Sequence, residues 1–219
     1  MVDQIAILIP TKGRQHRLER VVANALESTP AASVYLLMEP DEAFDVPGAT
    51  TLTQDDGLGG YAQAINYGYR STKEPLLFAG ADDLNFWDGW ATECRILLEK
   101  PDVAVVGTND LGNSDVQRGE HATHYLVRRS YLDKPGGVYG EPRTFLSEAY
   151  DHGFTDREFT RTAILRGVFA PCLTANVEHM HPAWAKAPMD ATYDRGYKSD
   201  DADRELYHER MAAVEEALS

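Results

Sequence analysis

The stretch Leu76-Leu77-Phe78-Ala79-Gly80-Ala81-Asp82-Asp83-Leu84 is an apolar run that stops abruptly at two adjacent carboxylates. A short apolar run of this kind is typical of a buried strand in a parallel sheet. The carboxyl ends of such strands form the edge at which open α/β sheets bind ligands. The hard oxygens of a carboxylate pair suit Mg²⁺ or Mn²⁺, above all beside a substrate phosphate. A strand followed by a simple Asp-containing turn explains the same residues equally well.

Apolar runs and amphipathic stretches alternate on both sides of this stretch. We expect strands at 5–9, 33–38, 49–54 and 103–107, and helices at 16–28, 61–70 and 87–99. Strands that alternate with helices predict a mostly parallel central sheet with helices on both faces, which is a three-layer α/β/α sandwich. The carboxylates therefore fall at the predicted ligand-binding edge of this sheet.

The second half of the chain is less regular. We expect a loop at 108–120, a short strand at 124–127, a helix at 155–165 and a last strand at 168–177. Pro171 has no amide donor, which favours an edge position for that last strand. An amphipathic helix is expected at 200–218, and the many acidic residues between 190 and 216 are expected on a solvated surface.

Composition limits the class of protein. The 219 residues fit one domain, or one domain with an appendage. No apolar run is long enough to span a bilayer, and residues 1–5 lack the features of a signal peptide. We expect Cys94 and Cys172 to be reduced core residues, not a disulfide pair. These points favour the cytoplasm.

The chain is acidic as a whole but has a local basic cluster near its start. A formal net charge of −14 argues against broad, non-specific binding to nucleic acid. A basic cluster nevertheless lies near the start of the chain, at Lys12, Arg14, Arg17 and Arg20. Lys12 and Arg14 lie in the loop after the first strand, at the ligand-binding edge, where their positive charge suits a diphosphate. An ordinary exposed basic loop is the alternative.

Several motifs, in this order and spacing, resemble those of GT-A fold glycosyltransferases of the family 2 type. They are Ile9-Pro10-Thr11-Lys12-Gly13-Arg14, Gly59-Gly60-Tyr61-Ala62-Gln63-Ala64-Ile65-Asn66, Phe78-Ala79-Gly80-Ala81-Asp82-Asp83 and Thr155-Asp156-Arg157-Glu158-Phe159. His179, after an apolar strand, resembles the late histidine of that family that meets the metal and the diphosphate. The resemblance covers residues 5–182. The small size of the chain and its segment 179–186 also resemble phage-encoded members.

The resemblance implies a GT-A fold, a nucleotide-diphosphate sugar as donor and Mn²⁺ or Mg²⁺ as cofactor. The implied metal ligands are Asp82, Asp83, His179 and His181. The implied donor-binding residues are Pro10, Thr11, Lys12, Arg14, Glu39, Gln54, Asp55, Gly60, Gly80, Ala81, Asp82 and Lys186. We expect a single catalytic domain at 1–186, with a nucleotide-binding half at 1–107 and an acceptor half at 108–186. A tail with the amphipathic helix follows at 187–219.

The chain departs from the family pattern at three positions. Gly80 replaces the first acid of the DxD motif, which puts the usual contact with the nucleotide ribose in doubt. Thr155 replaces the first acid of the catalytic-base motif, so the base assignment depends on Asp156. Glu39 stands where the family usually has an aspartate that touches the base of the nucleotide.

Each candidate residue also has an ordinary structural explanation. Asp156 could be the general base, or it could cap the helix that follows. Asp151 and Glu148 are competing bases nearby. Lys186 could fold over the phosphates as part of a lid, and Trp184 could stack on a sugar or anchor the tail in the core. Either late histidine could be an ordinary surface or hydrogen-bonded residue.

The predicted function is a metal-dependent, inverting glycosyltransferase of the hexosyltransferase type that uses a UDP-linked sugar. One rival is a nucleotidyltransferase acting on sugar phosphates, which also joins an acid pair to a basic loop. The other is a non-catalytic sugar-nucleotide or glycan-binding protein of the same fold, which the loss of the acid at Gly80 supports. The acceptor stays open between a protein, a glycan, a lipid-linked sugar and a modified DNA base.

Overall fold

The fold is an eight-stranded mixed sheet, seen in a computed structural model that describes residues 4–218, apart from the side chains of 195–197, 199 and 200. The strand order is β3-β2-β1-β4-β7-β6-β8-β5. The strands are β1 (Ile5–Pro10), β2 (Ser33–Leu37), β3 (Ala49–Leu52), β4 (Leu76–Ala79), β5 (Leu84–Phe86), β6 (Val105–Asn109), β7 (Tyr125–Arg128) and β8 (Phe169–His179). Neighbours pair in parallel except that β7 is antiparallel to β4 and β6, and β5 is antiparallel to β8.

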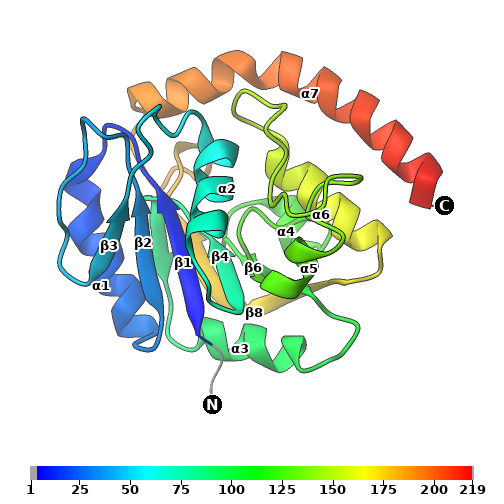
Figure 1. The fold of residues 1–219 in the computed structure, drawn as a ribbon, viewed down its shortest axis with the longest axis horizontal. Helices are drawn as coiled ribbons and strands as arrows, with labels where there is room; N and C mark the ends of the chain where they lie inside the picture. The colour runs from blue at the N-terminus through cyan, green and yellow to red at the C-terminus, as the bar shows by residue number, and fades with distance from the viewer. Residues whose placement is uncertain (1–3, 219) are drawn as a thin grey trace.

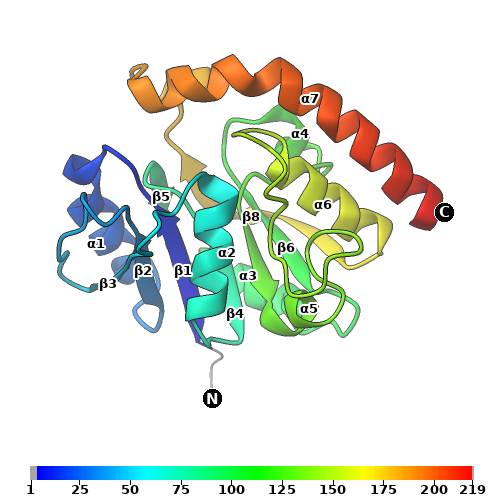
Figure 2. The ribbon, with the colours of Figure 1, turned by 45° about the horizontal axis from the view of Figure 1, so that its top comes forward.

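Helices cover both faces of this sheet, as Figures 1 and 2 show. They are α1 (Leu18–Ser28), α2 (Tyr61–Ser71), α3 (Trp90–Leu98), α4 (Ser114–Gln117), α5 (Arg129–Asp133), α6 (Thr155–Leu165) and α7 (Ala191–Leu218). The buried faces of α1 and α3 belong to one hydrophobic cluster, and those of α2, α5 and α6 belong to another. The expected three-layer sandwich with a mostly parallel sheet is confirmed.

The alternation of side chains explains why the first and fourth strands are continuously apolar. In β1, Ile5, Ile7 and Ile9 pack in the α1/α3 cluster, whereas Ala6 and Leu8 pack in the α2 cluster. Successive strand residues point to opposite faces, so a strand covered on both sides has no position for a polar side chain. The same division holds along β4.

The opening stretch is not one strand to its end. β4 stops at Ala79, and Leu84 begins the separate strand β5 after a turn that carries both aspartates. Residues 108–120 are likewise not a loop throughout, because Thr108 and Asn109 extend β6 and α4 forms at Ser114–Gln117. In α4 the Asn113 side chain caps the helix by accepting a hydrogen bond from the Asp115 amide.

The edge position expected for the last strand is wrong. β8 lies between β6 and β5 in the sheet. β5 pairs only with the far end of β8, where Leu84 opposes His179. Pro171 lies in the earlier part of β8, opposite Gly107 of β6. β5 does not pair with this part of β8, so the missing amide of Pro171 costs no hydrogen bond to β5. Proline is therefore tolerated in an inner strand because its second neighbour is short.

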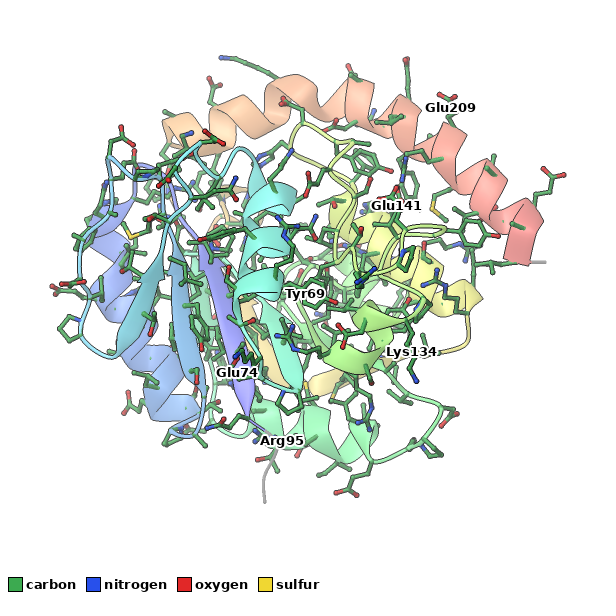
Figure 3. All side chains as sticks on the ribbon, viewed as in Figure 1. Tyr69, Glu74, Arg95, Lys134, Glu141 and Glu209 are labelled. Carbon is green, nitrogen blue, oxygen red and sulfur yellow. The ribbon has the colours of Figure 1, made fainter. Side chains whose placement is uncertain are left out.

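The C-terminal helix is longer than expected and has a narrow buried side. α7 begins at Ala191 and arches over the ends of α2 and α6 in both views (Figures 1 and 2). Met211 and Val214 are buried, whereas Glu209 lies on the outer side of the helix (Figure 3). Most acidic residues of this segment are exposed, as expected, and Asp203 is the exception at 4% exposure.

Two further expectations can be compared with the structure. Cys94 and Cys172 are both free and buried, as expected. Among the residues described, no helix combines the length and the apolar character needed to cross a membrane.

Candidate active site

A cleft of about 530 Å³ opens where β1, β2 and β4 end. Of the predicted site residues, those that line it are Pro10, Thr11, Lys12, Arg14, Glu39, Gly60, Ala81, Asp82, Asp83, Asp156, His179 and His181. Gln54, Asp55, Gly80 and Lys186 do not line it. The loop after β1 and the turn after β4 meet here because the parallel strands β1 and β4 are neighbours.

Asp82 is buried between two donors from the first loop. Its Oδ2 accepts a hydrogen bond of 2.8 Å from the Thr11 hydroxyl, and its Oδ1 accepts one of 3.0 Å from Arg14 Nη1. Burial and the adjacent charge of Asp83 raise the pKa of Asp82, while Arg14 and Thr11 oppose the shift. Both oxygens of this carboxylate are therefore already engaged by the protein.

Arg14 links the first loop to the start of α7. Its Nε and Nη2 donate to the two oxygens of Asp190, at 2.9 and 2.8 Å. The guanidinium also stacks on the ring of Tyr193, 3.9 Å from its centroid. Burial opposes the charge of Arg14, but Asp190 and Asp82 outweigh it and raise the pKa. Asp190 and Tyr193 were not among the predicted site residues, because each lies more than 170 residues along the chain from Arg14.

Asp83 has one satisfied oxygen and one without a partner. Its Oδ2 accepts hydrogen bonds from the Tyr193 hydroxyl at 2.8 Å and from His179 Nε2 at 3.2 Å. Its Oδ1 is buried and has no hydrogen-bond partner among the residues that the structure describes. Burial opposes ionisation, but His179 and Tyr193 outweigh it and lower the pKa of Asp83. The charge of Asp83 in turn raises the pKa of His179, although burial alone would lower it.

Three histidine rings follow one another along the same wall. The ring centroids of His124 and His179 are 5.1 Å apart, and those of His179 and His181 are 4.9 Å apart. Burial and the neighbouring His179 lower the pKa of His124 and of His181 to about 4. Both rings are therefore neutral at pH 7, which is the form that binds metals. His124 was not among the predicted site residues, because its sequence context indicated the start of a strand.

A divalent cation fits one part of this wall. An orphaned carboxylate oxygen on Asp83 and neutral imidazoles beside it are donors that such an ion accepts. Asp82 is less available, since Thr11 and Arg14 hold both of its oxygens. Within residues 4–218, apart from the undescribed side chains, no three His, Cys, Asp or Glu side chains are already grouped as a metal site. Further ligands would have to come from a substrate.

Asp156 lies in the first turn of α6 and faces the cleft. The N-cap residue of this helix is Phe154, not Asp156, but Oδ1 of Asp156 accepts a hydrogen bond of 2.8 Å from the Arg157 amide in the first turn. Its Oδ2 lies 3.2 Å from Nε2 of His121, a buried residue behind the cleft. Burial opposes ionisation of Asp156, but His121 and Arg157 outweigh it and lower its pKa. Asp156 is a carboxylate at neutral pH.

The competing acids differ in position. Glu148 accepts a hydrogen bond of 2.8 Å from the Asn66 side chain and does not line the cleft. Asp151 does line the cleft, in a loop that α7 holds in place. Asp203 of α7 accepts hydrogen bonds from the backbone amides of residues 151–153, at 2.8 to 2.9 Å. The C-terminal helix therefore positions the loop that leads into α6.

Two predicted donor-binding residues are engaged elsewhere. Lys186 forms an ion pair of 2.8 Å with Glu178 and donates to the Leu111 carbonyl, away from the cleft. Trp184 also lies outside the cleft and packs against Gly112, which agrees with the anchoring role considered for it. Lys12 does face the cleft, where it pairs with Glu39 at 3.0 Å.

Gly80 has no room for the acid that the family pattern places there. A Cβ atom built on this residue would lie 2.9 Å from the Leu8 carbonyl oxygen, to which the Gly80 amide donates. The backbone of β1 therefore occupies the space that a side chain would need. The departure from the family pattern is built into the packing of β1 against the end of β4.

Comparisons with known proteins give matches in structure only. No family model matches the chain, and no curated protein matches it. The catalytic domain of Drosophila β1,4-galactosyltransferase 7, in complex with xylobiose, is 17% identical with a TM-score of 0.54, over 90% of this chain and 81% of that one. A mannosyltransferase from Pyrobaculum calidifontis, in complex with GDP-Man and Mn²⁺, is 14% identical with a TM-score of 0.61.

The extent of the matches differs. The mannosyltransferase match covers 81% of this chain but only 56% of that protein. Glucosyl-3-phosphoglycerate synthase from Mycobacterium tuberculosis, in complex with Mn²⁺, UDP and phosphoglyceric acid, is 12% identical with a TM-score of 0.57, over 82% of this chain and 72% of that one. At these identities the likeness is one of fold, and the chain has the GT-A fold of these glycosyltransferases.

Proposed function

We propose that this protein is a metal-dependent glycosyltransferase that moves a sugar from a nucleotide-diphosphate donor to an acceptor hydroxyl, with inversion at the anomeric carbon. One observation carries the proposal. Two groups of residues line the same cleft. The first is the positive charge of Arg14 with the pair Asp83 and His179, and the second is the ionised carboxylate of Asp156. The first group suits a diphosphate and its metal, and the second suits proton removal.

The structural neighbours support the donor class. The Drosophila galactosyltransferase has been solved with manganese and UDP-Gal, the mannosyltransferase with GDP-Man and Mn²⁺, and the mycobacterial synthase with UDP-glucose and Mn²⁺. Two of these three use uridine nucleotides, so a UDP-linked sugar is the first donor to test. Mn²⁺ is the first metal to test for the same reason, with Mg²⁺ as the alternative.

Departure of the diphosphate requires its growing negative charge to be neutralised. A bound divalent ion supplies this as a Lewis acid. Asp83 would hold that ion through its Oδ1, while His179 bonds the other oxygen of Asp83 and Asp82 stays paired with Arg14. Arg14 stands at the same wall as a fixed positive charge. Arg14 is only 6% exposed, and Asp82, Asp190 and Tyr193 hold the orientation of its guanidinium.

Attack requires the acceptor hydroxyl to lose its proton. Asp156 accepts this proton as the oxygen of the acceptor forms its bond to the anomeric carbon and the bond to the diphosphate oxygen breaks. A general base of this kind contributes about 10² to 10⁴-fold. With one base and no second carboxylate acting as nucleophile, the displacement is direct and inverts the configuration.

The acceptor belongs to the proposal only as a class. It must offer a hydroxyl near Asp156, in the part of the cleft bordered by Asp151 and His152. The galactosyltransferase was solved with xylobiose and the mycobacterial synthase with phosphoglyceric acid. A glycan is therefore the first acceptor to test, before a protein, a lipid-linked sugar or a modified DNA base.

A thermal-shift screen tests the donor. UDP-, GDP- and TDP-linked sugars are added with and without Mn²⁺, and the melting temperature is followed. A donor at a hundred times its Kd stabilises the protein by about 2.7 kcal/mol. We expect one nucleotide class to raise the melting temperature, and to do so more strongly with Mn²⁺. If no nucleotide sugar stabilises the protein under any metal condition, the proposal fails.

A non-catalytic sugar-nucleotide-binding protein is the second candidate. Two observations favour it: the space for an acid at Gly80 is closed, and Asp190 already occupies Arg14. Both candidates predict donor binding, but only an enzyme predicts release of the nucleoside diphosphate from the donor. Coupled detection of free UDP, with water or xylobiose as acceptor, distinguishes them.

A further inference from the structure

Two buried acceptor atoms without partners stand at the same wall of the cleft. One is Oδ1 of Asp83, in the turn after β4, and the other is Nε2 of His124, just before β7. The two residues are 4% and 3% exposed. Buried polar atoms are nearly always paired, and an unpaired one calls for a specific explanation such as a bound ion.

The backbone determines which nitrogen of His124 is the acceptor. Nδ1 lies 2.9 Å from the carbonyl oxygen of Ala79, the last residue of β4. A carbonyl can only accept, so Nδ1 carries the hydrogen and donates it. Nε2 therefore presents a lone pair. A backbone carbonyl that fixes the far nitrogen in this way is the usual support of a metal-binding histidine.

Among the described residues, no donor bonds either atom. The two donors that contact Asp83, His179 Nε2 and the Tyr193 hydroxyl, both bind its other oxygen. Asp110, which lies near His124, is itself an acceptor and is satisfied by two backbone amides and the Thr123 hydroxyl. Two acceptors that share a buried wall repel each other, and a cation relieves both at once.

We propose that His124 Nε2 and Asp83 Oδ1 are ligands of one divalent cation at the end of β4. A carboxylate oxygen with an imidazole nitrogen suits Mn²⁺. The grouping accounts for the lack of a three-residue metal site among the described side chains, because two protein ligands leave several positions open. That a donor diphosphate fills some of these positions rests on the proposed function. His124, the residue before β7, thereby becomes a ligand of the metal.

The ordinary alternative is structural. His124 could accept a hydrogen bond from a buried hydroxyl or water and serve only to join β7 to β4. That role predicts a loss of stability on substitution and no change in the affinity for metal. Metal affinity, measured apart from turnover, is therefore the discriminating quantity.

The experiment titrates Mn²⁺ into the full chain, with and without UDP, and follows free Mn²⁺ by electron paramagnetic resonance. The variant is His124→Asn, whose side-chain amide can still donate to the Ala79 carbonyl but has nothing in place of Nε2. The control is His208→Ala, an exposed histidine on α7. We expect His124→Asn to weaken Mn²⁺ binding in the presence of UDP at least tenfold, and His208→Ala to leave it unchanged.

A second measurement leaves His124 intact, in case its variant does not fold. The cleft is lined by four histidines, and the triple variant His152→Ala/His179→Ala/His181→Ala leaves His124 as the last of them. Pulsed electron paramagnetic resonance of the Mn²⁺–UDP complex then detects directly bound imidazole nitrogen. A remaining nitrogen signal supports His124 as a ligand, and its disappearance overturns the inference.

The outcomes separate this inference from the proposed function. If wild-type protein binds Mn²⁺ with UDP and a folded His124→Asn variant binds them equally well, the inference is wrong and the function stands. If wild-type protein binds Mn²⁺ through His124 but no nucleotide, the metal site stands and the function is wrong. If wild-type protein binds no Mn²⁺ in either condition, the site is overturned.

Discussion

The cleft has two acidic walls, one at the end of β4 and one at the start of α6. The pKa of Asp82 in the first wall and that of Asp156 in the second are shifted in opposite directions. At the end of β4, Asp82 is buried beside Asp83, and its pKa is raised in spite of the ion pair with Arg14. At the start of α6, Asp156 is a single acid supported by His121, and its pKa is lowered. Asp82, which lies beside a second acid, depends on a nearby cation to remain ionised. Asp156 is ionised beside His121 and is therefore in the form that can accept a proton.

The largest expected effect removes the isolated acid. Asp156→Asn should lower turnover by about 10² to 10⁴-fold while sparing donor binding, because the diphosphate lies at the other wall. Release of free UDP gives the rate, and the thermal shift with donor and Mn²⁺ gives the binding. Glu148→Gln is the control, since Glu148 lies outside the cleft. A variant that loses turnover and donor binding together would contradict the division between the walls.

The second largest effect is expected when Arg14, the positively charged partner of Asp82, is removed. Arg14→Ala leaves Asp82 buried without its ion partner, which should destabilise the fold by roughly 3 to 5 kcal/mol. Urea unfolding measures this change. Arg20→Ala, at an exposed position of α1, is the control and should stay within about 0.5 kcal/mol of wild type. If Arg14→Ala is as mild as the control, Asp82 does not depend on Arg14.

A third effect tests the closed space at the end of β4. Gly80→Asp restores the acid of the family pattern but forces a Cβ against the Leu8 carbonyl. We expect a destabilisation of roughly 1 to 3 kcal/mol, the usual cost of overpacking, and no gain in Mn²⁺ affinity. Ala81→Ser changes the next residue, which lines the cleft and is only partly buried, and should cost less. Tighter Mn²⁺ binding by a stable Gly80→Asp variant would contradict this account.

The smallest effect concerns pH at the α6 wall. The pKa of Asp156 is lowered, so its stabilising contribution is complete above the ordinary aspartate pKa of about 3.9 and is lost as the pH falls through the folded-state value. Protonation of Asp156 should therefore limit turnover only below that ordinary value. His121→Asn removes a source of the lowering and should move this acid limb to higher pH. Turnover measured from pH 3.5 to 8 checks the direction.

Much of the fold could be predicted from local pattern. The helix at 155–165 matches α6 as it stands, and the strand expected at 5–9 is β1 with one residue added. These elements obey simple periodicities, because β1 is buried on both faces and α6 on one. The failures lie where tertiary context decides: the short strand β5 has too few residues to show a period, and the inner position of β8 depends on which strand ends beside it.

The site residues also fall into those that local sequence could predict and those that depend on tertiary structure. Acids and histidines that follow apolar strands could be placed at the ligand-binding edge, and most of them line the cleft. Lys186 could not be placed, because its ion pair with Glu178 depends on how the segment after β8 turns back. His121 follows an irregular polar segment and His124 was placed at the start of a predicted strand, so nothing local distinguished them from other buried histidines.

The sequence alone therefore determined the layers of this protein and the edge at which its chemistry lies, because burial on one or two faces leaves a periodic trace along the chain. Only the tertiary structure decided which atoms of that edge remain available. Thr11 and Arg14 engage Asp82, Tyr193 engages one oxygen of Asp83, and Ala79 orients His124. Such pairings join residues distant in sequence, and hydrogen bonding between distant segments leaves no period to detect.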